Sequence, residues 1–261
     1  MAQIHPTALV SSSAQLDDTV VVEAHAIIGD QVSIGPRTRI MARAWIGGYT
    51  TLGADNVVHM GAVIGHEPQD FAFDPAVRSY VQIGDGNVIR EYATIHRGTH
   101  PETVTAIGNH NFLMVGVHVG HNCSIGDHTV IVNNALLGGH VQIGDRAFVS
   151  GGVVLHQFCR VGRLAMVSGN ARVSMDVPPF VNALERNQVQ GLNLVGLKRA
   201  GVTREALREL KHAYRILFQE RLHRREAHEQ LAAAGFVSAE AQEFVAFVRS
   251  ATRPLVQPRE R

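Results

Sequence analysis

The sequence predicts a mainly β fold, a three-sided parallel β-helix over residues 1–177, followed by a C-terminal α-helical segment over residues 178–261. Two observations support this prediction. First, an aliphatic residue recurs every six positions, eleven times in succession from Ile4 to Ile64 and again without a break from Ile107 to Val173. An α-helix repeats every 3.6 residues or so and a strand alternates, so neither explains this period. Second, the period ends at Pro178, and a helical pattern replaces it.

Each six-residue unit is predicted to form one short strand and one turn. The aliphatic residue points inward, and the residue two positions before it is usually small, as at Ala26 and Ala62, so that it fits beneath the corner. A glycine often follows, as at Gly29 and Gly65, and allows turn conformations that other residues resist. Three units make one triangular coil of about 18 residues, and the coils stack by parallel strand pairing around a thin core.

Two stretches interrupt the period and are predicted to be loops, at residues 66–82 and 96–106. The step from Ile64 to Ile83 is one residue longer than three units, and the intervening sequence contains proline and phenylalanine. In the second stretch Pro101 stands where an aliphatic residue is expected. Loops on a rigid scaffold often line binding sites, although they are also where insertions are tolerated.

The C-terminal segment contains two predicted amphipathic helices that pack on the end of the prism and cover its last open edge. Thr203 is a candidate N-cap of the first helix, and Ser238 begins the second. Their apolar faces are predicted to comprise Leu207, Leu210, Tyr214, Leu217 and Phe218 in the first helix, and Phe244, Phe247 and Val248 in the second.

Composition narrows the class of protein. Two cysteines cannot build a disulfide framework, the N-terminus has no secretory signal pattern, and no apolar run approaches a membrane span, so the expected location is cytoplasmic. Residues 178–261 carry 14 basic and nine acidic residues. This excess is explained either by solvated helix faces or by a face that meets an acidic partner. Nucleic-acid binding is not predicted, because no basic stripe is interleaved with aromatic residues.

Histidines gather at one edge of the predicted prism. Positions 121, 139 and 157 share one phase of the coil, so His121 is expected to stack on Gly139, with His140 and His156 beside it and His118 half a unit away. Isolated histidines are more often ordinary surface or core residues. Four of them on one edge indicate a site instead, and acid–base chemistry is the use that suits imidazole near neutral pH.

Two other uses of this edge are disfavoured. Cys123 and Cys159 lie two residues before Ile125 and Val161, in the small inward position, so they are predicted to be packing residues rather than nucleophiles. Metal ligation is not predicted, because residues three apart in an extended coil point in different directions and no carboxylate completes a ligand set.

Six segments resemble the UDP-N-acetylglucosamine acyltransferases of lipid A biosynthesis, within the hexapeptide-repeat acyltransferase superfamily. They are HRGT (96–99), HVGHNC (118–123), NNALLGGHV (133–141), VLHQFCRVG (154–162), DVPPFV (176–181) and GLNLVGLKRAG (191–201). The resemblance implies a left-handed β-helix and a homotrimer with sites between subunits. It implies transfer of a 3-hydroxyacyl group from acyl carrier protein to the 3-hydroxyl of UDP-N-acetylglucosamine, with acyl carrier protein as a cosubstrate and no cofactor.

The resemblance also assigns roles to residues. His121 matches the general base, the Gly139 N–H matches the donor to the oxyanion, and Asn122 matches the residue that orients the base. Gly169 and Met166 match the positions that measure the acyl chain, although Gly169 is equally explained as a turn glycine. The residues that match substrate contacts are Gln69, Asp70, His118, His140, His156, Gln157, Asn193 and Arg199.

The sequence departs from the family at two positions of the site. Asn122 stands where the family usually has Asp, and Ala72 stands where it usually has Lys. The acceptor is therefore alternatively a different UDP-sugar, such as a 3-amino analogue that would give an amide. A third possibility is a catalytically silent structural or binding solenoid, against which the histidine edge argues. The cations expected to steer the acidic carrier protein are Arg160, Arg163, Arg204, Arg208, Lys211 and Arg215.

Overall fold

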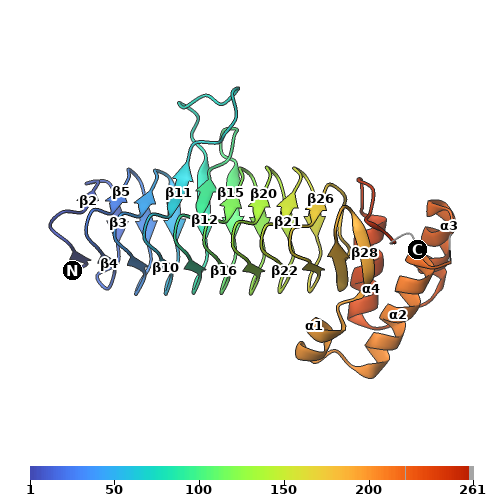
Figure 1. Ribbon diagram of the computed structural model, residues 1–261. Coiled ribbons are helices and arrows are strands. Elements are labelled where there is room, and N and C mark those ends of the chain that lie inside the picture. The colour runs from blue at the N-terminus through green and yellow to red at the C-terminus, as the bar shows by residue number, and fades with distance from the viewer. Residues whose placement is uncertain (221, 259–261) are drawn as a thin grey trace.

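The computed structural model describes residues 1–220 and 222–258, which form a long triangular prism with helices packed at its C-terminal end (Figure 1). The predicted C-terminal segment includes residues 221 and 259–261, which lie outside the described part. Each side of the prism is one parallel sheet, and we call these sheets face 1, face 2 and face 3. The predicted parallel β-helix is thus confirmed.

Face 1 continues beyond the prism into an antiparallel pair and a final short strand. In spatial order it comprises β1 (Gln3–Ile4), β4 (Val21–Val22), β7 (Arg39–Ile40), β10 (Val57–Val58), β13 (Val88–Ile89), β16 (Phe112–Leu113), β19 (Val130–Ile131), β22 (Phe148–Val149), β25 (Met166–Val167), β27 (Val181–Leu184), β28 (Gln188–Leu192) and β29 (Gln257–Pro258).

The other two faces contain only parallel neighbours. Face 2 comprises β2 (Leu9–Val10), β5 (Ile27–Ile28), β8 (Trp45–Ile46), β11 (Val63–His66), β14 (Thr94–His96), β17 (His118–Val119), β20 (Leu136–Leu137), β23 (Val154–Leu155) and β26 (Arg172–Val173). Face 3 comprises β3 (Gln15–Leu16), β6 (Ser33–Ile34), β9 (Thr50–Leu52), β12 (Tyr80–Ile83), β15 (Val104–Ile107), β18 (Ser124–Ile125), β21 (Gln142–Ile143) and β24 (Arg160–Val161).

The core is the row of aliphatic residues that the six-residue period marks. Val119 pairs in register with Leu137, 18 residues on, and Leu137 pairs with Leu155. All three side chains are buried, and Ile46 and Ile64 are equally buried nearer the N-terminus. The register of one coil on the next is therefore set by burial of one residue in six, since a slip by one residue would turn the row outward.

Both predicted loops leave the prism at the same edge, between faces 2 and 3. The longer one spans residues 67–79, between β11 and β12, and stands away from the prism (Figure 1). The shorter spans residues 97–103, between β14 and β15. We call this the histidine edge, because it also carries His121 and its neighbours, described below.

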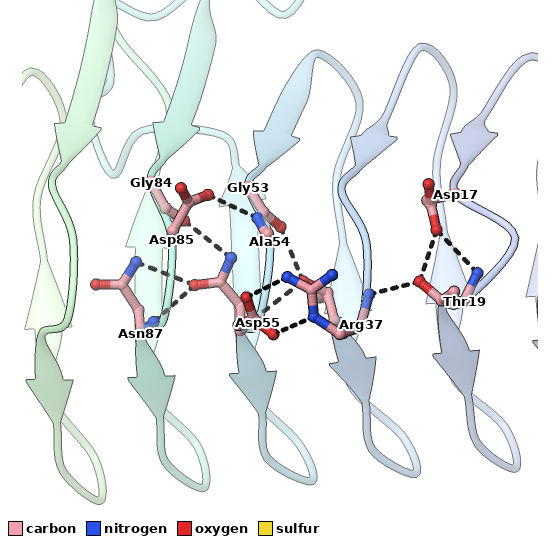
Figure 2. A network of polar contacts seen from close by, with 11 residues as sticks. Asp17, Thr19, Arg37, Gly53, Ala54, Asp55, Gly84, Asp85 and Asn87 are labelled. Atoms are coloured by element: carbon pink, nitrogen blue, oxygen red, sulfur yellow. Dashed lines mark hydrogen bonds and ion pairs between the residues drawn. The ribbon is translucent and has the colours of Figure 1, made fainter.

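Two polar ladders link successive coils along the edge between faces 3 and 1 (Figure 2): an exposed outer ladder that includes Arg37 and Asp55, and a buried inner ladder of asparagines. In the inner ladder the Asn87 amide nitrogen Nδ2 donates to Asn56 Oδ1 (3.0 Å) and to Gly108 O (3.0 Å), while Asn111 N donates to Asn87 Oδ1 (2.9 Å). The side chains are buried where an aliphatic or small residue is expected. Because they span the coils that contain the loops, these amides restore pairing where the chain length per coil changes.

We expect Asn87→Leu to lower the free energy of unfolding by about 2–3 kcal/mol, because it leaves the buried N–H of Asn111 and its other partners unpaired. Urea denaturation monitored by circular dichroism measures this loss. Asp55→Asn is the matched control: it removes the charge of the exposed Arg37–Asp55 pair of the outer ladder (2.6 Å), suits the left-handed backbone of residue 55, and is expected to have a much smaller effect than Asn87→Leu. An equal loss in both variants would contradict the role given to the inner ladder.

Helical structure begins later than the sequence predicts, because residues 181–192 first extend face 1 as β27 and β28. The helices are α1 (Leu194–Arg199), α2 (Arg204–Phe218), α3 (Arg224–Ala233) and α4 (Ala239–Arg249). The two predicted caps are confirmed: Thr203 accepts from Ala206 N, and Ser238 accepts from Ala241 N. Among the described residues, no helix has the length and apolar character needed to cross a membrane.

The helices join the prism core through apolar and ionic contacts. Leu210, Phe218, Phe244 and Val248 are buried as predicted, whereas Phe247 is only half-buried. The predicted cations of the prism end are part of this junction. Arg160 pairs with Asp176 (2.8 Å), and Arg163 pairs with Glu243 of α4; Arg160 also lies over the ring of Phe247.

Candidate active site

The structure brings His121, Gly139 and Gln157 together in successive turns of the histidine edge, as their shared phase predicts. His140 N donates to His121 O (2.9 Å), and Phe158 N donates to Gly139 O (2.9 Å), so each turn is hydrogen-bonded to the next. These backbone bonds fix the height at which each side chain leaves the prism, and His121 is half-buried there.

The His121 imidazole packs directly against Gly139. A Cβ at Gly139 would come within 2.4 Å of His121 Cε1 and 2.5 Å of Nε2. Real Cβ atoms do not approach so closely, so glycine is what permits the observed position of the ring. Within the described chain the Gly139 N–H has no hydrogen-bond acceptor, and it is therefore free to donate to a ligand beside His121.

Asn122 determines which nitrogen of His121 carries the proton. Its Oδ1 accepts hydrogen bonds from Thr99 N (3.1 Å) and from Thr99 Oγ1 (3.0 Å), and it lies 2.9 Å from His121 Nδ1. A backbone N–H can only donate, so the amide oxygen faces these groups and Nδ1 must be protonated. Nε2, next to Gly139, is left with a lone pair, which is the state a general base needs.

His118 lies on β17 rather than in the turn, and its Nδ1 is hydrogen-bonded to Thr94 Oγ1 (2.8 Å). Burial, with His96 and His121 nearby, lowers the pKa of His118 to about 4. The ring is consequently neutral at physiological pH, and it can orient a substrate by hydrogen bonding but cannot supply a positive charge.

The other predicted histidines continue along the edge. The His140 ring packs edge-on against His121, with 5.1 Å between centroids, and stacks on the exposed ring of Phe158 at 4.5 Å. Burial lowers the pKa of His140 as well. His156 and Gln157 are exposed on the next coil, with His156 Nδ1 3.2 Å from Gln157 O.

Gln69 and Asp70 lie in the 67–79 loop and are both exposed at this edge. Asp70 Oδ1 accepts from the N–H of Ala72 (2.9 Å), which closes a turn within the loop. Seven predicted residues besides the base therefore share one edge with it: Gln69, Asp70, Asn122, Gly139, His140, His156 and Gln157.

The remaining predicted residues lie elsewhere on the chain. Met166, Asn193 and Arg199 line a cavity of about 670 Å³ between face 1 and helix α1, together with Phe148 and Leu192. Asn193 also has a structural role that the sequence does not reveal. Its Nδ2 donates to Leu164 O (2.9 Å), and its Oδ1 accepts from Gly196 N (3.0 Å) as the N-cap of α1.

Gly169 occupies the corner between faces 1 and 2 and is exposed. Its φ lies outside the left-handed region, and a Cβ there would meet no atom closer than Gly151 O at 3.5 Å. The turn itself therefore does not require glycine at this position. Within one chain, the residues predicted to measure the acyl chain, Met166 and Gly169, therefore lie away from His121 and Gly139, which are predicted to perform the chemistry.

The cysteines are core residues, as predicted. Burial raises the pKa of Cys123 to about 12 and that of Cys159 to about 11, so neither thiol forms a nucleophilic thiolate at physiological pH. In the part of the chain that the structure describes, no three His, Cys, Asp or Glu side chains converge as they would around a metal ion.

Comparison with known proteins agrees with this architecture. Residues 176–256 match the family model described as UDP N-acetylglucosamine O-acyltransferase, domain 2, and residues 105–139 match the bacterial transferase hexapeptide model. The acyl-(acyl-carrier-protein)–UDP-N-acetylglucosamine O-acyltransferase of Syntrophobacter fumaroxidans is 44% identical over 98% of this chain and 100% of its own length. That of Halorhodospira halophila is 40% identical over the same shares.

Solved structures agree equally well. The UDP-N-acetylglucosamine acyltransferase of Francisella novicida superimposes with a TM-score of 0.95 at 37% identity, covering 98% of this chain and 94% of that one. The predicted left-handed β-helix followed by helices is confirmed by this agreement. The chain belongs to the family of acyl-(acyl-carrier-protein)–UDP-N-acetylglucosamine O-acyltransferases.

Proposed function

We propose that this protein transfers a 3-hydroxyacyl chain from acyl carrier protein to the 3-hydroxyl of UDP-N-acetylglucosamine, the first step of lipid A biosynthesis. The observation that carries the proposal is the pairing of His121 with Gly139. A half-buried imidazole has its proton held on Nδ1 by Asn122, and its free Nε2 lies beside an unpaired backbone N–H. This arrangement suits attack of a hydroxyl on a thioester.

In this mechanism His121 Nε2 takes the proton of the sugar hydroxyl as its oxygen bonds to the thioester carbonyl carbon. The carbonyl oxygen becomes an oxyanion, which accepts a hydrogen bond from the Gly139 N–H. The intermediate then collapses, the carbon–sulfur bond breaks, and the proton passes from Nε2 to the departing thiolate of the carrier protein. No covalent enzyme intermediate forms, and acyl carrier protein is the cosubstrate in place of a cofactor.

Within one chain, Met166 and Gly169 lie away from the histidine edge, and this separation supports a homotrimer in which two chains complete each site. Face 2 exposes Leu136 and Val154, which are 43% and 40% exposed, and face 1 exposes Phe148, which is 39% exposed. Face 3, by contrast, presents polar side chains such as Ser124 and Gln142. Face 1 of one copy packed on face 2 of the next closes a ring of three prisms. Such packing brings Met166 of one copy toward the histidine edge of its neighbour.

Helix α2 is the surface we propose for acyl carrier protein, which is acidic. Arg204, Arg208, Lys211 and Arg215 are exposed on it, with Arg215 paired to Glu220 at the surface (3.3 Å), whereas Arg160 and Arg163 are held by acidic partners in the junction. We propose the cytoplasm as the compartment, where free thiols such as Cys123 and Cys159 persist.

The function is tested by incubating the protein with 3-hydroxyacyl carrier proteins and a panel of UDP-hexosamines, with mass spectrometry of the nucleotide sugar. We expect an ester with UDP-N-acetylglucosamine. Product only with the 3-amino analogue would move the assignment to the related acyltransferase that Asn122 and Ala72 suggest. If no UDP-hexosamine gave a product, the remaining hypothesis would be a catalytically silent structural or binding solenoid.

We expect this enzyme to prefer a long acyl chain, and Gly169→Met to shift the preference toward shorter chains. Gly169 lies 48 residues, or about 2.7 coils, beyond His121, which is about 13 Å along the prism at the usual spacing of strands. Its missing side chain leaves the far end of the groove open. Initial rates with carrier proteins bearing different chains measure the preference, and Gly169→Ala, which adds little bulk, is the control. Unchanged preference in the methionine variant would rule out this role.

A further inference from the structure

The HRGT segment, residues 96–99, lies between the 67–79 loop and the histidine edge, and its contacts reach both. We infer that this segment is a bracket that holds the loop and the His121 imidazole in one fixed relation, with Arg97 and Thr99 as positioning residues. The inference rests on the proposed function, in which His121 is the base and the loop carries Gln69 and Asp70.

Arg97 holds the loop from within. Its Nη1–H donates to Val77 O (2.8 Å), its Nη2–H donates to Pro75 O (3.3 Å), and its guanidinium lies over the ring of Phe73, 5.0 Å from the centroid. Nη2 is also 3.8 Å from the carboxylate of Glu67. Arg97 is only 8% exposed, and a guanidinium removed from water needs its hydrogen-bond partners. These partners all belong to the loop, so Arg97 fixes its conformation.

The residues on either side of Arg97 fasten both ends of the loop. His96 Nδ1–H donates to Glu67 O (2.5 Å) where the loop begins, and Ser79 Oγ–H donates to Gly98 O (2.6 Å) where it ends. Gly98 permits this arrangement, because a Cβ there would lie 2.3 Å from Thr103 Oγ1 and 2.7 Å from Thr103 O. The loop is therefore attached to the HRGT segment at its start, its middle and its end.

Thr99, one residue further, holds Asn122. Its N–H and its hydroxyl both donate to Asn122 Oδ1, and Thr105 Oγ1 accepts from the Asn122 N–H (2.7 Å). Thr99 and Thr105 are both buried. Asn122 is thus held from both its backbone and its side chain, with its amide oxygen turned toward His121.

These hydrogen bonds matter because an asparagine amide has an acceptor oxygen on one side and a donor NH₂ group on the other. If the Asn122 amide turned over, its NH₂ would face His121 Nδ1. The imidazole would then accept there, its proton would move to Nε2, and the lone pair needed by the base would be lost. Thr99 opposes the turn, since its backbone N–H can only donate and its hydroxyl supplies a second donor to the same oxygen. A carboxylate presents oxygen on both sides, so an aspartate at position 122 would not depend on Thr99.

Thr99 should therefore matter for activity when residue 122 is asparagine and matter little when it is aspartate. We expect Thr99→Val, which leaves the backbone N–H as the remaining donor to Asn122 Oδ1, to lower kcat by about three- to tenfold while KM for the nucleotide sugar changes little, and Thr99→Ser to restore kcat. In an Asn122→Asp background, Thr99→Val is expected to change kcat by less than about twofold. A merely structural role for Thr99 would lower kcat equally in both backgrounds, and that result would overturn the inference.

Two further measurements complete the design. Arg97→Met is expected to raise KM for the nucleotide sugar, with Arg97→Lys intermediate, since the loop loses its internal anchor while Asn122 stays in place. Thermal unfolding of every variant is followed, and Thr99→Ala, which removes the hydroxyl without adding bulk, repeats the test. An inactive wild-type protein would contradict the proposed function. An active wild-type protein together with fully active Thr99 variants would contradict the positioning role of Thr99 and leave the proposed function intact.

Discussion

Replacing His121 with alanine is expected to lower kcat by about 10² to 10⁴-fold, the usual contribution of a positioned general base. The sugar hydroxyl then has no group within reach to take its proton, whereas binding of either substrate is expected to change little. Initial rates at saturating acyl carrier protein and nucleotide sugar measure the loss. Imidazole added to the buffer is expected to restore part of the rate, because the variant leaves room beside Gly139.

His128→Ala is the matched control for this variant. His128 likewise lies in a turn, but it is exposed where His121 is half-buried; it stacks on His110, with 5.0 Å between ring centroids, at the edge between faces 3 and 1. We expect it to keep full activity. Retained turnover in His121→Ala, or an equal loss in His128→Ala, would remove His121 from the mechanism.

Gly139→Ala is expected to lower kcat by at least about tenfold with little loss of stability. The three atoms nearest to the added Cβ all belong to the His121 ring, so the methyl group displaces the base and touches little else. The backbone N–H proposed to donate to the oxyanion remains, so this variant tests the position of the His121 ring separately from loss of that donor. Activity and the thermal unfolding midpoint, measured together, distinguish this effect from misfolding.

Gly151→Ala provides the comparison, because it also lies in a turn and its Cβ would come no closer than 3.3 Å to any atom. We expect that variant to remain fully active. If Gly139→Ala were as active as Gly151→Ala, the close approach of the imidazole to Gly139 would have no part in the reaction.

The sequence was sufficient to predict the fold and where several candidate site residues lie relative to one another, because of its periodicity. One coil is 18 residues, so residues that share a phase must stack, and the placement of His121 on Gly139 followed from counting alone. The same counting placed Cys123 in the core. Periodicity fails where coils change length, so it did not predict that Thr99 contacts Asn122, 23 residues away across a loop.

Two other features could not be read from the sequence. Asn193 matches a substrate contact in the family, but in this chain both ends of its amide are engaged with Leu164 and Gly196. A capping asparagine gives no sign of its role until the helix boundary is known, and strands β27 and β28 moved that boundary beyond the expected position. Phe158 was not predicted because an exposed aromatic ring has no periodic signature, although it stacks on His140.

The stacking of whole coils has a consequence for how chain-length preference can change. In the proposed role of Gly169, the distance along the prism between His121 and Gly169 can change only by whole strand spacings, each about 4.8 Å. It cannot be adjusted gradually, because residues added at a corner, as in the 67–79 loop, leave the pairing and therefore the spacing of neighbouring strands unchanged. We therefore expect the accepted length in this chain to change in two ways: by a side chain that stops the proposed groove early, or by gain or loss of a complete coil.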